Sequence, residues 1–502
     1  MSFAVAAGDQ LTAEAAADVL RAGGTAVDAA VAGALAACVC EPVLASLLGG
    51  GFLMVREAEG RAHLLDFFVQ TPRRKLPETD IDLRAIEADF GETKQTFHIG
   101  AGAIAAQGVP RGLTEAHMRF GRMPLPELAA PAVRMAAEGR PLGGFQAKVL
   151  EIVRPIFEST PEALTTFGDG AAPLKAGDIY RNEALADVID TYAREGDRFV
   201  MEGEVAGALL ALSGAHVTGG DLKGYAPIWR EPLEERRADA RLMLNPPPSL
   251  GGALIAFALR LMPNGAAPAD VARAFAATSR ARLAANLNRQ PEAGAVRRLA
   301  PDLAKLYADE VAVQKAATRG TTHISVIDAT GMGAALTLSN GEGCGLIAPG
   351  TGLMPNNMLG EEDLIPGDLL SWAEDTRLSS MMAPMAIDWP DGRAAMLGSG
   401  GSNRIRTALA QVAAHLIDSD LPMEDAIAAP RLHVEGAKDP KADFEDRFAE
   451  GDREALLAAY PEANPWPTDS MFFGGAHGAM RTAKGDATAA GDPRREGVAI
   501  VG

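Results

Sequence analysis

One segment constrains this chain of 502 residues more than any other, and it runs from Gly320 to Asp328. From Thr322 onward β-branched residues alternate, which predicts a strand that ends in a turn at residues 329–331. If the Gly320–Thr321 peptide bond were cut, the α-amine of Thr321 would lie within hydrogen-bond reach of its own hydroxyl. One residue would then hold both a nucleophile and its base. Spacing alone favours a simpler interpretation, a buried strand that happens to begin with two threonines.

The composition indicates a soluble globular protein, because 47% of the residues are apolar and 23% are charged. The net charge of −19 argues against nucleic acid or an anionic membrane surface as a partner. The N-terminus lacks the basic and apolar regions of a signal peptide, and the most apolar stretch, residues 29–40, is too short to span a bilayer. We therefore expect a cytoplasmic protein. The three cysteines have no metal-ligand spacing and no dinucleotide motif occurs, so the sequence predicts neither a metal nor a cofactor.

Four ordered runs carry a resemblance to a known family. They are Gly320 to Asp328, Leu336-Thr337-Leu338-Ser339-Asn340, Ala348-Pro349-Gly350-Thr351-Gly352 and Asn356-Asn357-Met358. Together they resemble the γ-glutamyltranspeptidase family of N-terminal nucleophile hydrolases. Further motifs that resemble this family occur in the same order from Gly23 to Gly502. The resemblance implies a four-layer αββα sandwich, in which two central antiparallel sheets lie between helical layers. It also implies a precursor that cuts itself into residues 1–320 and 321–502, which stay associated as one domain.

The resemblance assigns the acyl-transfer machinery to a few positions. Thr321 corresponds to the nucleophile, and Ser339 corresponds to a second hydroxyl that hydrogen-bonds to it. Gly400 and Gly401 correspond to the oxyanion hole, where backbone N–H groups must converge on one point. Counting back from the following Arg-Ile pair selects Gly401 and Ser402 instead, so both registers remain open.

The resemblance also assigns a substrate site. Ser379 and Ser380 match serines that contact the α-carboxylate of the γ-glutamyl donor. Asn340 lies near the family's amine-binding asparagine, and Glu361 is the first choice for the acidic residue that pairs with the donor's ammonium. We expect a structural role for His323, which alternates onto the same face as the nucleophile.

One position departs from the family pattern. The family carries an arginine that holds the donor carboxylate with two parallel hydrogen bonds, and this chain has Phe68 at that position, followed by Val69 in place of a glutamate. Arg73 and Arg74 follow closely, and we interpret them as solvated surface residues.

The sequence is therefore compatible with three functions. The first is a γ-glutamyltransferase or γ-glutamyl hydrolase that acts on glutathione or a related donor. The second is an acylase or small-amide hydrolase without glutamyl specificity, for which Phe68 is the main argument. The third is a non-catalytic binding relative. The expected partner is a small-molecule amide, and the sequence is compatible with both a monomer and a homodimer.

The elements that surround these positions are predicted from the spacing of apolar residues. Apolar spacing predicts helices over residues 12–22, from a cap at Thr25 to about Cys40, and over residues 253–261. Residues 265–318 are Ala- and Arg-rich and helical in tendency, and we expect the last of them to form a loop that is released on cleavage. Cys38 and its neighbour Cys40 are interpreted as small buried hydrophobic residues.

Overall fold

Two antiparallel sheets form the centre of the molecule. The computed structural model describes residues 2–89, 94–284, 320–362, 364–365, 368–436 and 439–502. The seven-stranded sheet has the order β20 (Val498–Val501), β1 (Ala4–Ala7), β11 (Thr322–Ile327), β12 (Gly333–Ser339), β2 (Gly50–Arg56), β3 (Ala62–Phe67) and β8 (Ile228–Arg230). The six-stranded sheet has the order β19 (Ala487–Ala490), β18 (Gly475–Arg481), β14 (Ala394–Gly400), β13 (Met385–Asp388), β10 (Ala240–Leu244) and β9 (Leu233–Arg237).

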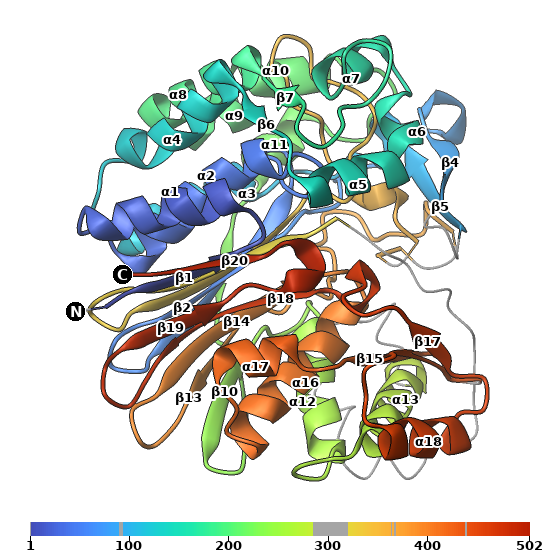
Figure 1. The fold of residues 1–502 in the computed structure, drawn as a ribbon. Helices are drawn as coiled ribbons and strands as arrows, with labels where there is room; N and C mark the ends of the chain where they lie inside the picture. Colours follow the sequence, from blue (N-terminus) through green and yellow to red (C-terminus); the bar gives the residue numbers. More distant parts are fainter. Residues whose placement is uncertain (1, 90–93, 285–319, 363, 366–367, 437–438) are drawn as a thin grey trace.

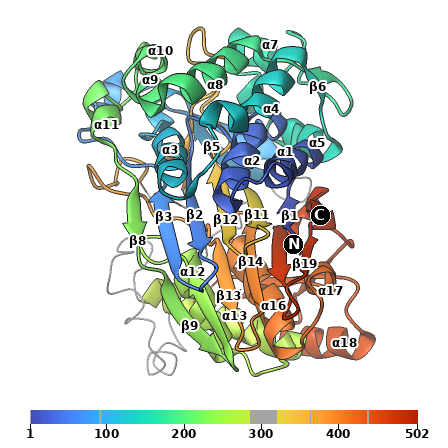
Figure 2. The same ribbon diagram turned by 90° about the vertical axis from the view of Figure 1, so that its left-hand side faces the viewer.

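Helices cover the outer face of each sheet (Figures 1 and 2). The seven-stranded sheet packs against α1 (Gln10–Arg21), α2 (Ala26–Cys40) and α3 (Val109–Phe120), with α4 (Leu125–Glu138) and α8 (Glu183–Glu195) further out. The six-stranded sheet lies against α16 (Arg404–Asp418) and α17 (Met423–Ala428), with α12 (Gly251–Leu261), α13 (Pro268–Ala284) and α18 (Glu450–Ala459) in the same layer. The predicted four-layer αββα sandwich is confirmed.

The remaining elements are shorter. They are α5 (Gly144–Ile152), α6 (Arg154–Phe157), α7 (Pro161–Thr166), α9 (Asp197–Met201), α10 (Glu204–Leu210), α11 (Gly219–Gly224), the hairpin β4 (Arg84–Asp89) and β5 (Lys94–Ile99), the pair β6 (Arg140–Pro141) and β7 (Ile179–Tyr180), and the small sheet β15 (Leu432–Glu435), β16 (Lys441–Glu445) and β17 (Asn464–Trp466). Among the described residues, no helix has the length and apolar character needed to cross a membrane.

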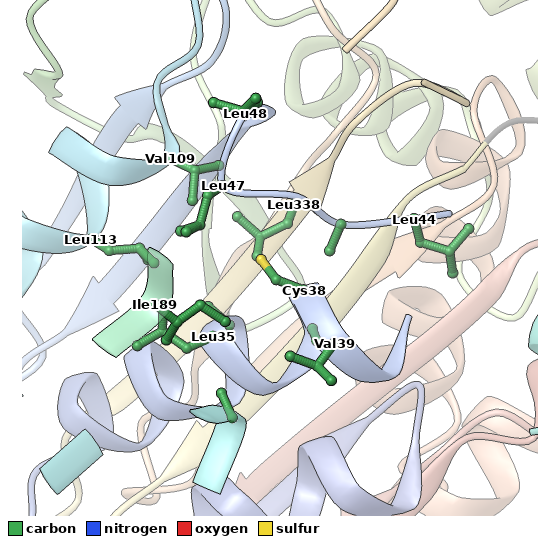
Figure 3. Close-up of a cluster of buried hydrophobic side chains, with 14 of the residues drawn as sticks. Leu35, Cys38, Val39, Leu44, Leu47, Leu48, Val109, Leu113, Ile189 and Leu338 are labelled. Carbon is green, nitrogen blue, oxygen red and sulfur yellow. The ribbon is translucent and has the colours of Figure 1, made fainter. Parts of the chain in front are cut away.

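The first two helices form where the sequence predicts them. The Asp9 carboxylate accepts from the backbone at the start of α1, and Thr25 with Asp28 makes a reciprocal capping box at the start of α2. Every residue of α2 is buried, since the helix lies between the sheet and the outer helices. Figure 3 shows Cys38 of α2 in a cluster of buried apolar side chains, near Leu338 of β12. Burial raises the pKa of the Cys38 thiol to about 12, so the cysteine is an inert packing residue.

Strand β11 is an interior strand of the seven-stranded sheet, where it pairs with β1 on one side and β12 on the other. Its inner face packs against β14 and β18 of the other sheet. Thr321 therefore directly precedes a strand that lies inside one sheet and is covered by the other. Within the segment 265–318, which was predicted to be helical in tendency, residues Pro268–Ala284 form α13. The loop that we expect to be released on cleavage lies outside the described residues.

Candidate active site

The bond predicted to break is held on both sides. The register of β11 and β12 pairs Thr322 with Leu338, which brings Ser339 beside the Gly320–Thr321 peptide. The Ser339 hydroxyl donates a hydrogen bond of 2.6 Å to the Gly320 carbonyl oxygen, and it accepts one of 3.1 Å from the Gly341 N–H. A hydroxyl that donates to this carbonyl polarises it toward attack.

The residues on either side of this peptide are also fixed. The Gly320 N–H donates to Glu342 Oε1 at 3.1 Å, and Arg495 Nη1 donates to the Thr321 carbonyl oxygen at 3.4 Å. Thr321 itself is 5% exposed. The chain thus presents a buried, immobilised peptide to the adjoining hydroxyl.

The predicted oxyanion-hole glycines lie at the junction of β14 and α16. A Cβ on Gly400 would stand 2.1 Å from the Thr321 carbonyl oxygen, so the close approach of the two backbones requires glycine there. Gly401 has a φ of 124° and Ser402 a φ of 54°, after which α16 begins at Arg404. Ser402 lines the pocket described next, whereas Gly400 contacts the backbone of Thr321.

A pocket opens beside Thr321. Five of the predicted side chains line it, namely Thr321, Ser339, Glu361, Ser379 and Ser380. They come from four separate parts of the chain: the start of β11, the end of β12, the loop after Asn356-Asn357-Met358, and the segment before β13. Hydroxyls, one carboxylate and the threonine therefore converge in one place, which is what acyl transfer with a polar substrate requires.

Asn340 is the predicted substrate residue that does not line this pocket. Its side-chain N–H donates to the Met354 carbonyl oxygen at 3.1 Å, and its backbone N–H donates to the Leu44 carbonyl oxygen at 3.2 Å. The residue is 2% exposed and ties the end of β12 to two loops. Its contacts in the uncut chain are structural.

Phe68, the departure from the family pattern, lies on the pocket wall. Its ring stacks on Phe52 with 5.5 Å between centroids, and the residue is 1% exposed. Its carbonyl oxygen accepts from the Tyr225 hydroxyl at 2.7 Å and from the Arg377 guanidinium. A fixed aromatic ring therefore stands where the family pattern has a guanidinium.

The neighbouring arginines do not replace that guanidinium. Arg73 is half-exposed and pairs with Asp375 at 3.4 Å, and Arg74 is exposed. Neither lines the pocket, in agreement with their interpretation as surface residues. The guanidinium of Arg377 donates to the Ala226 carbonyl at 2.6 Å and to Phe68, so it is engaged by the scaffold.

His323 belongs to the layer between the sheets. Its ring nitrogens lie 2.8 Å from Thr337 Oγ1 and 2.8 Å from Ser325 Oγ, and the residue is fully buried. Burial, with a smaller effect of His477, holds the pKa of His323 well below its usual range. A neutral histidine bonded to two strand hydroxyls is a core residue, as its position on the strand predicts.

The sequence patterns do not predict several residues that hydrogen-bond to the segment around the Gly320–Thr321 bond. Glu342 and Arg495 were not assigned roles, although the first follows Asn340 closely and the second lies in the run near the C-terminus that resembles the family. Glu41 accepts a 2.6 Å hydrogen bond from the hydroxyl of Thr322, a residue 281 positions away. No local pattern signals this long-range pair, because Glu41 ends α2 and reaches Thr322 only through the packing of α2 against β11.

Comparison with known proteins places these features in a family. The crystal structure of cephalosporin acylase from Bacillus halodurans has the same fold, with a TM-score of 0.83 at 21% identity over 99% of this chain and 95% of that one. The chain matches the family described as Gamma-glutamyltranspeptidase over residues 12–502, and it belongs to that family.

Relatives within the family carry different names. The chain is 30% identical to the glutathione hydrolase proenzyme of Pseudomonas aeruginosa, over 86% of this chain and 82% of that protein. It is 29% identical to the acylase ACY 1 proenzyme of Pseudomonas sp. (strain V22), over 89% of this chain and 85% of that protein. Family membership therefore leaves the acyl group of the substrate open.

Proposed function

We propose that the chain is a precursor that cuts itself between Gly320 and Thr321 and thereby becomes an amide hydrolase with an N-terminal threonine nucleophile. The observation that carries this proposal is the 2.6 Å hydrogen bond from Ser339 Oγ to the Gly320 carbonyl oxygen. That contact polarises the carbonyl that the adjacent Thr321 hydroxyl must attack.

Self-cleavage proceeds in two steps, an acyl shift from nitrogen to oxygen and the hydrolysis of the ester that it forms. The Thr321 oxygen bonds to the Gly320 carbonyl carbon, the C–N bond breaks, and the hydroxyl proton passes to the departing nitrogen. Water then hydrolyses the resulting ester, which leaves a carboxylate on Gly320 and a free amine on Thr321.

Catalysis repeats this chemistry on a substrate. The α-amine of Thr321 accepts the proton of the Thr321 hydroxyl as the hydroxyl oxygen attacks the amide carbonyl of the substrate. It then donates this proton to the amine that leaves the substrate. Water or an amino compound then takes the acyl group.

We infer an acylase specificity without a requirement for a γ-glutamyl donor. The support is Phe68, whose ring is fixed on the pocket wall and has no hydrogen-bond donor for an α-carboxylate. A buried aromatic ring favours an apolar portion of the acyl chain at that point.

γ-Glutamyl transfer or hydrolysis is the second candidate. Glu361, Ser379 and Ser380 line the pocket with Thr321, and they would suit the ammonium and carboxylate of a γ-glutamyl group. Two hydroxyls hold a carboxylate less strongly than a guanidinium fork does.

The two candidates are separated by turnover of chromogenic anilides. The self-cleaved wild type, Phe68→Arg and the apolar control Phe68→Leu are compared on γ-glutamyl anilide and on acyl anilides that lack the α-amino acid end. We expect the wild type and Phe68→Leu to prefer the latter by about tenfold or more in kcat/KM, and Phe68→Arg to shift the preference toward γ-glutamyl anilide. A wild type that prefers γ-glutamyl anilide would reverse the inferred specificity in favour of the second candidate.

A further inference from the structure

A buried arginine adjoins the predicted nucleophile from inside the protein. Arg495 Nη1 donates to the Thr321 carbonyl oxygen at 3.4 Å, and Arg495 is 4% exposed. Burial lowers the pKa of the Arg495 guanidinium to about 10, so the group keeps its charge at neutral pH. A buried positive charge therefore lies beside the residue that attacks the substrate in the proposed mechanism.

Glycines make room for the Arg495 side chain. A Cβ on Gly475 of β18 would stand 2.4 Å from Arg495 Cδ, and a Cβ on Gly400 of β14 would stand 2.8 Å from Arg495 Nη1. The Phe145 ring of α5 lies 5.4 Å from Arg495 Cζ. The side chain is thus held by β14, β18 and α5, with its charged end at the Thr321 carbonyl oxygen.

The carboxylate that most strongly influences Arg495 is paired with other cations. The Asp492 carboxylate forms ion pairs with Arg431 at 2.6 Å and with Arg494 at 3.2 Å. Asp492 raises the pKa of Arg495, but by less than burial lowers it. Within the part of the chain that the structure describes, no carboxylate oxygen lies within 4.0 Å of the Arg495 guanidinium. The charge of Arg495 is therefore not cancelled by an ion pair of its own.

This charge is close to the α-amine that cleavage would free. Cleavage of the Gly320–Thr321 bond leaves the Thr321 carbonyl unaltered, so the contact of that carbonyl with Arg495 is compatible with the cut chain. The nitrogen and the carbonyl oxygen of one residue are at most about 3.6 Å apart. Arg495 Nη1 therefore lies within about 7 Å of the Thr321 nitrogen.

Other charged groups surround the same amine. Those nearest to it, and those behind Arg495, are Glu342, Glu361, Arg282, Glu41, Asp492, Arg404 and Arg431. Carboxylates favour the protonated form of an amine, and guanidinium groups favour its neutral form. Arg495 differs from the rest of this set because it hydrogen-bonds directly to Thr321.

We propose that Arg495 keeps the α-amine of Thr321 uncharged at neutral pH, so that this amine can accept the proton of the attacking hydroxyl. An ordinary N-terminal amine has a pKa of about 7.7–8.0 and is mostly protonated at pH 7. A cation at about 7 Å in a buried site lowers this pKa to about 7 or below. Arg495 is a positioning residue in this role, because it acts through the amine. The inference rests on the Thr321 chemistry proposed above, and it adds the residue that tunes the base.

The test is the pH dependence of kcat/KM for an uncharged acyl anilide, which does not itself titrate between pH 5 and pH 9. The midpoint of the acidic limb reports the base of the free enzyme. We expect a midpoint at about pH 7 or below in the wild type, and a midpoint about one pH unit higher in Arg495→Gln. Arg495→Lys keeps the positive charge, so its midpoint should stay closer to that of the wild type.

Two control variants separate the charge of Arg495 from packing and from a second titrating group. Phe145→Leu removes the ring beside the guanidinium without changing the charge, so the midpoint should stay at the wild-type value. Glu41→Gln removes a carboxyl whose pKa is raised to about 7, and which contacts Thr322 on the other face of β11. We expect it to move the midpoint much less than Arg495→Gln does. Equal midpoints in the wild type and Arg495→Gln, or an equally large shift in either control, would overturn the inference.

The outcomes also separate this inference from the proposed function. A denaturing gel first shows whether each variant is cut into fragments 1–320 and 321–502. The midpoint does not depend on the fraction of chains that are cut, so a slowly cleaving Arg495→Gln still decides. If that variant is never cut, the wild type decides, and a midpoint at about pH 8 in a cut, active wild type contradicts the Arg495 inference alone. A wild type that is never cut and hydrolyses no anilide contradicts the proposed function as well.

Discussion

At the scale of residues, Glu41 connects the strand of the nucleophile to the helical layer. Side chains alternate across a strand, so Thr322 points away from the face on which His323 contacts Gly398 of the other sheet. On that opposite face Glu41 accepts hydrogen bonds from Thr322 Oγ1 at 2.6 Å and from Thr12 Oγ1 at 3.1 Å. Burial, with a smaller contribution from Asp9, raises the pKa of Glu41 from 4.5 to about 7.

This shift predicts a specific pH dependence of stability. Between pH 4.5 and about 7 the folded chain holds a proton on Glu41 that the unfolded chain has released, so the free energy of unfolding falls as the pH rises through this range. The shift corresponds to a loss of roughly 3 kcal/mol that is complete above about pH 7. Glu41→Gln should remove this component. Urea unfolding at pH 5 and pH 8 measures it, in an uncut Thr321→Ala background so that unfolding involves one chain. An identical pH dependence with and without Glu41 would contradict the assignment.

At the scale of elements, α2 depends on its first turn. The helix is buried on all sides and has no polar face to guide its placement, so its start is set by Thr25 and Asp28. The Thr25 hydroxyl accepts from the Asp28 N–H at 3.1 Å and donates to the Phe120 carbonyl oxygen at 3.1 Å. One hydroxyl thus caps α2 and joins it to the end of α3.

Thr25→Ala should therefore lower the free energy of unfolding by about 1–2 kcal/mol, the usual cost of losing a helix cap. Thr25→Ser, which keeps the hydroxyl, should lose much less. Urea midpoints of the two variants in the Thr321→Ala background provide the comparison. Equal midpoints for Thr25→Ala and its parent would show that the cap does not hold the helix.

Elements such as these were predictable from the sequence because their signals are local. Caps, apolar spacing and alternation predicted α1, α2 and β11 to within two residues, and the ordered motifs indicated the sandwich. The site was predictable only in part. Glu361, Ser379 and Ser380 do line the pocket, but the place of Arg282 there depends on how α13 packs against the wall, a contact that no local pattern encodes.

At the scale of the whole molecule, the two segments flanking Gly320–Thr321 are interleaved. In the seven-stranded sheet, β1 lies between β20 and β11, both of which come from residues 321–502. In the six-stranded sheet, β10 from the first segment pairs with β13 from the second. Neither segment has a complete sheet of its own, so each needs the other to satisfy its backbone hydrogen bonds.

We therefore expect the two fragments to remain associated after cleavage. They should elute together on gel filtration in native buffer and separate only in denaturant. The uncut Thr321→Ala chain provides the size reference. Elution of separate fragments under native conditions would contradict the interleaved arrangement as the source of association.

The most direct test of the central claim is the time course of self-cleavage. Freshly purified wild type, Thr321→Ala and Ser339→Ala are incubated and followed on a denaturing gel, with N-terminal sequencing of any fragment. We predict that the wild type yields two unequal fragments, the smaller beginning at Thr321, and that Thr321→Ala stays intact. Ser339→Ala should cut about 10²-fold more slowly, because the Gly320 carbonyl loses its 2.6 Å donor. A wild type that stays intact, or a Thr321→Ala chain that is cut at the same bond, would contradict the N-terminal threonine as nucleophile.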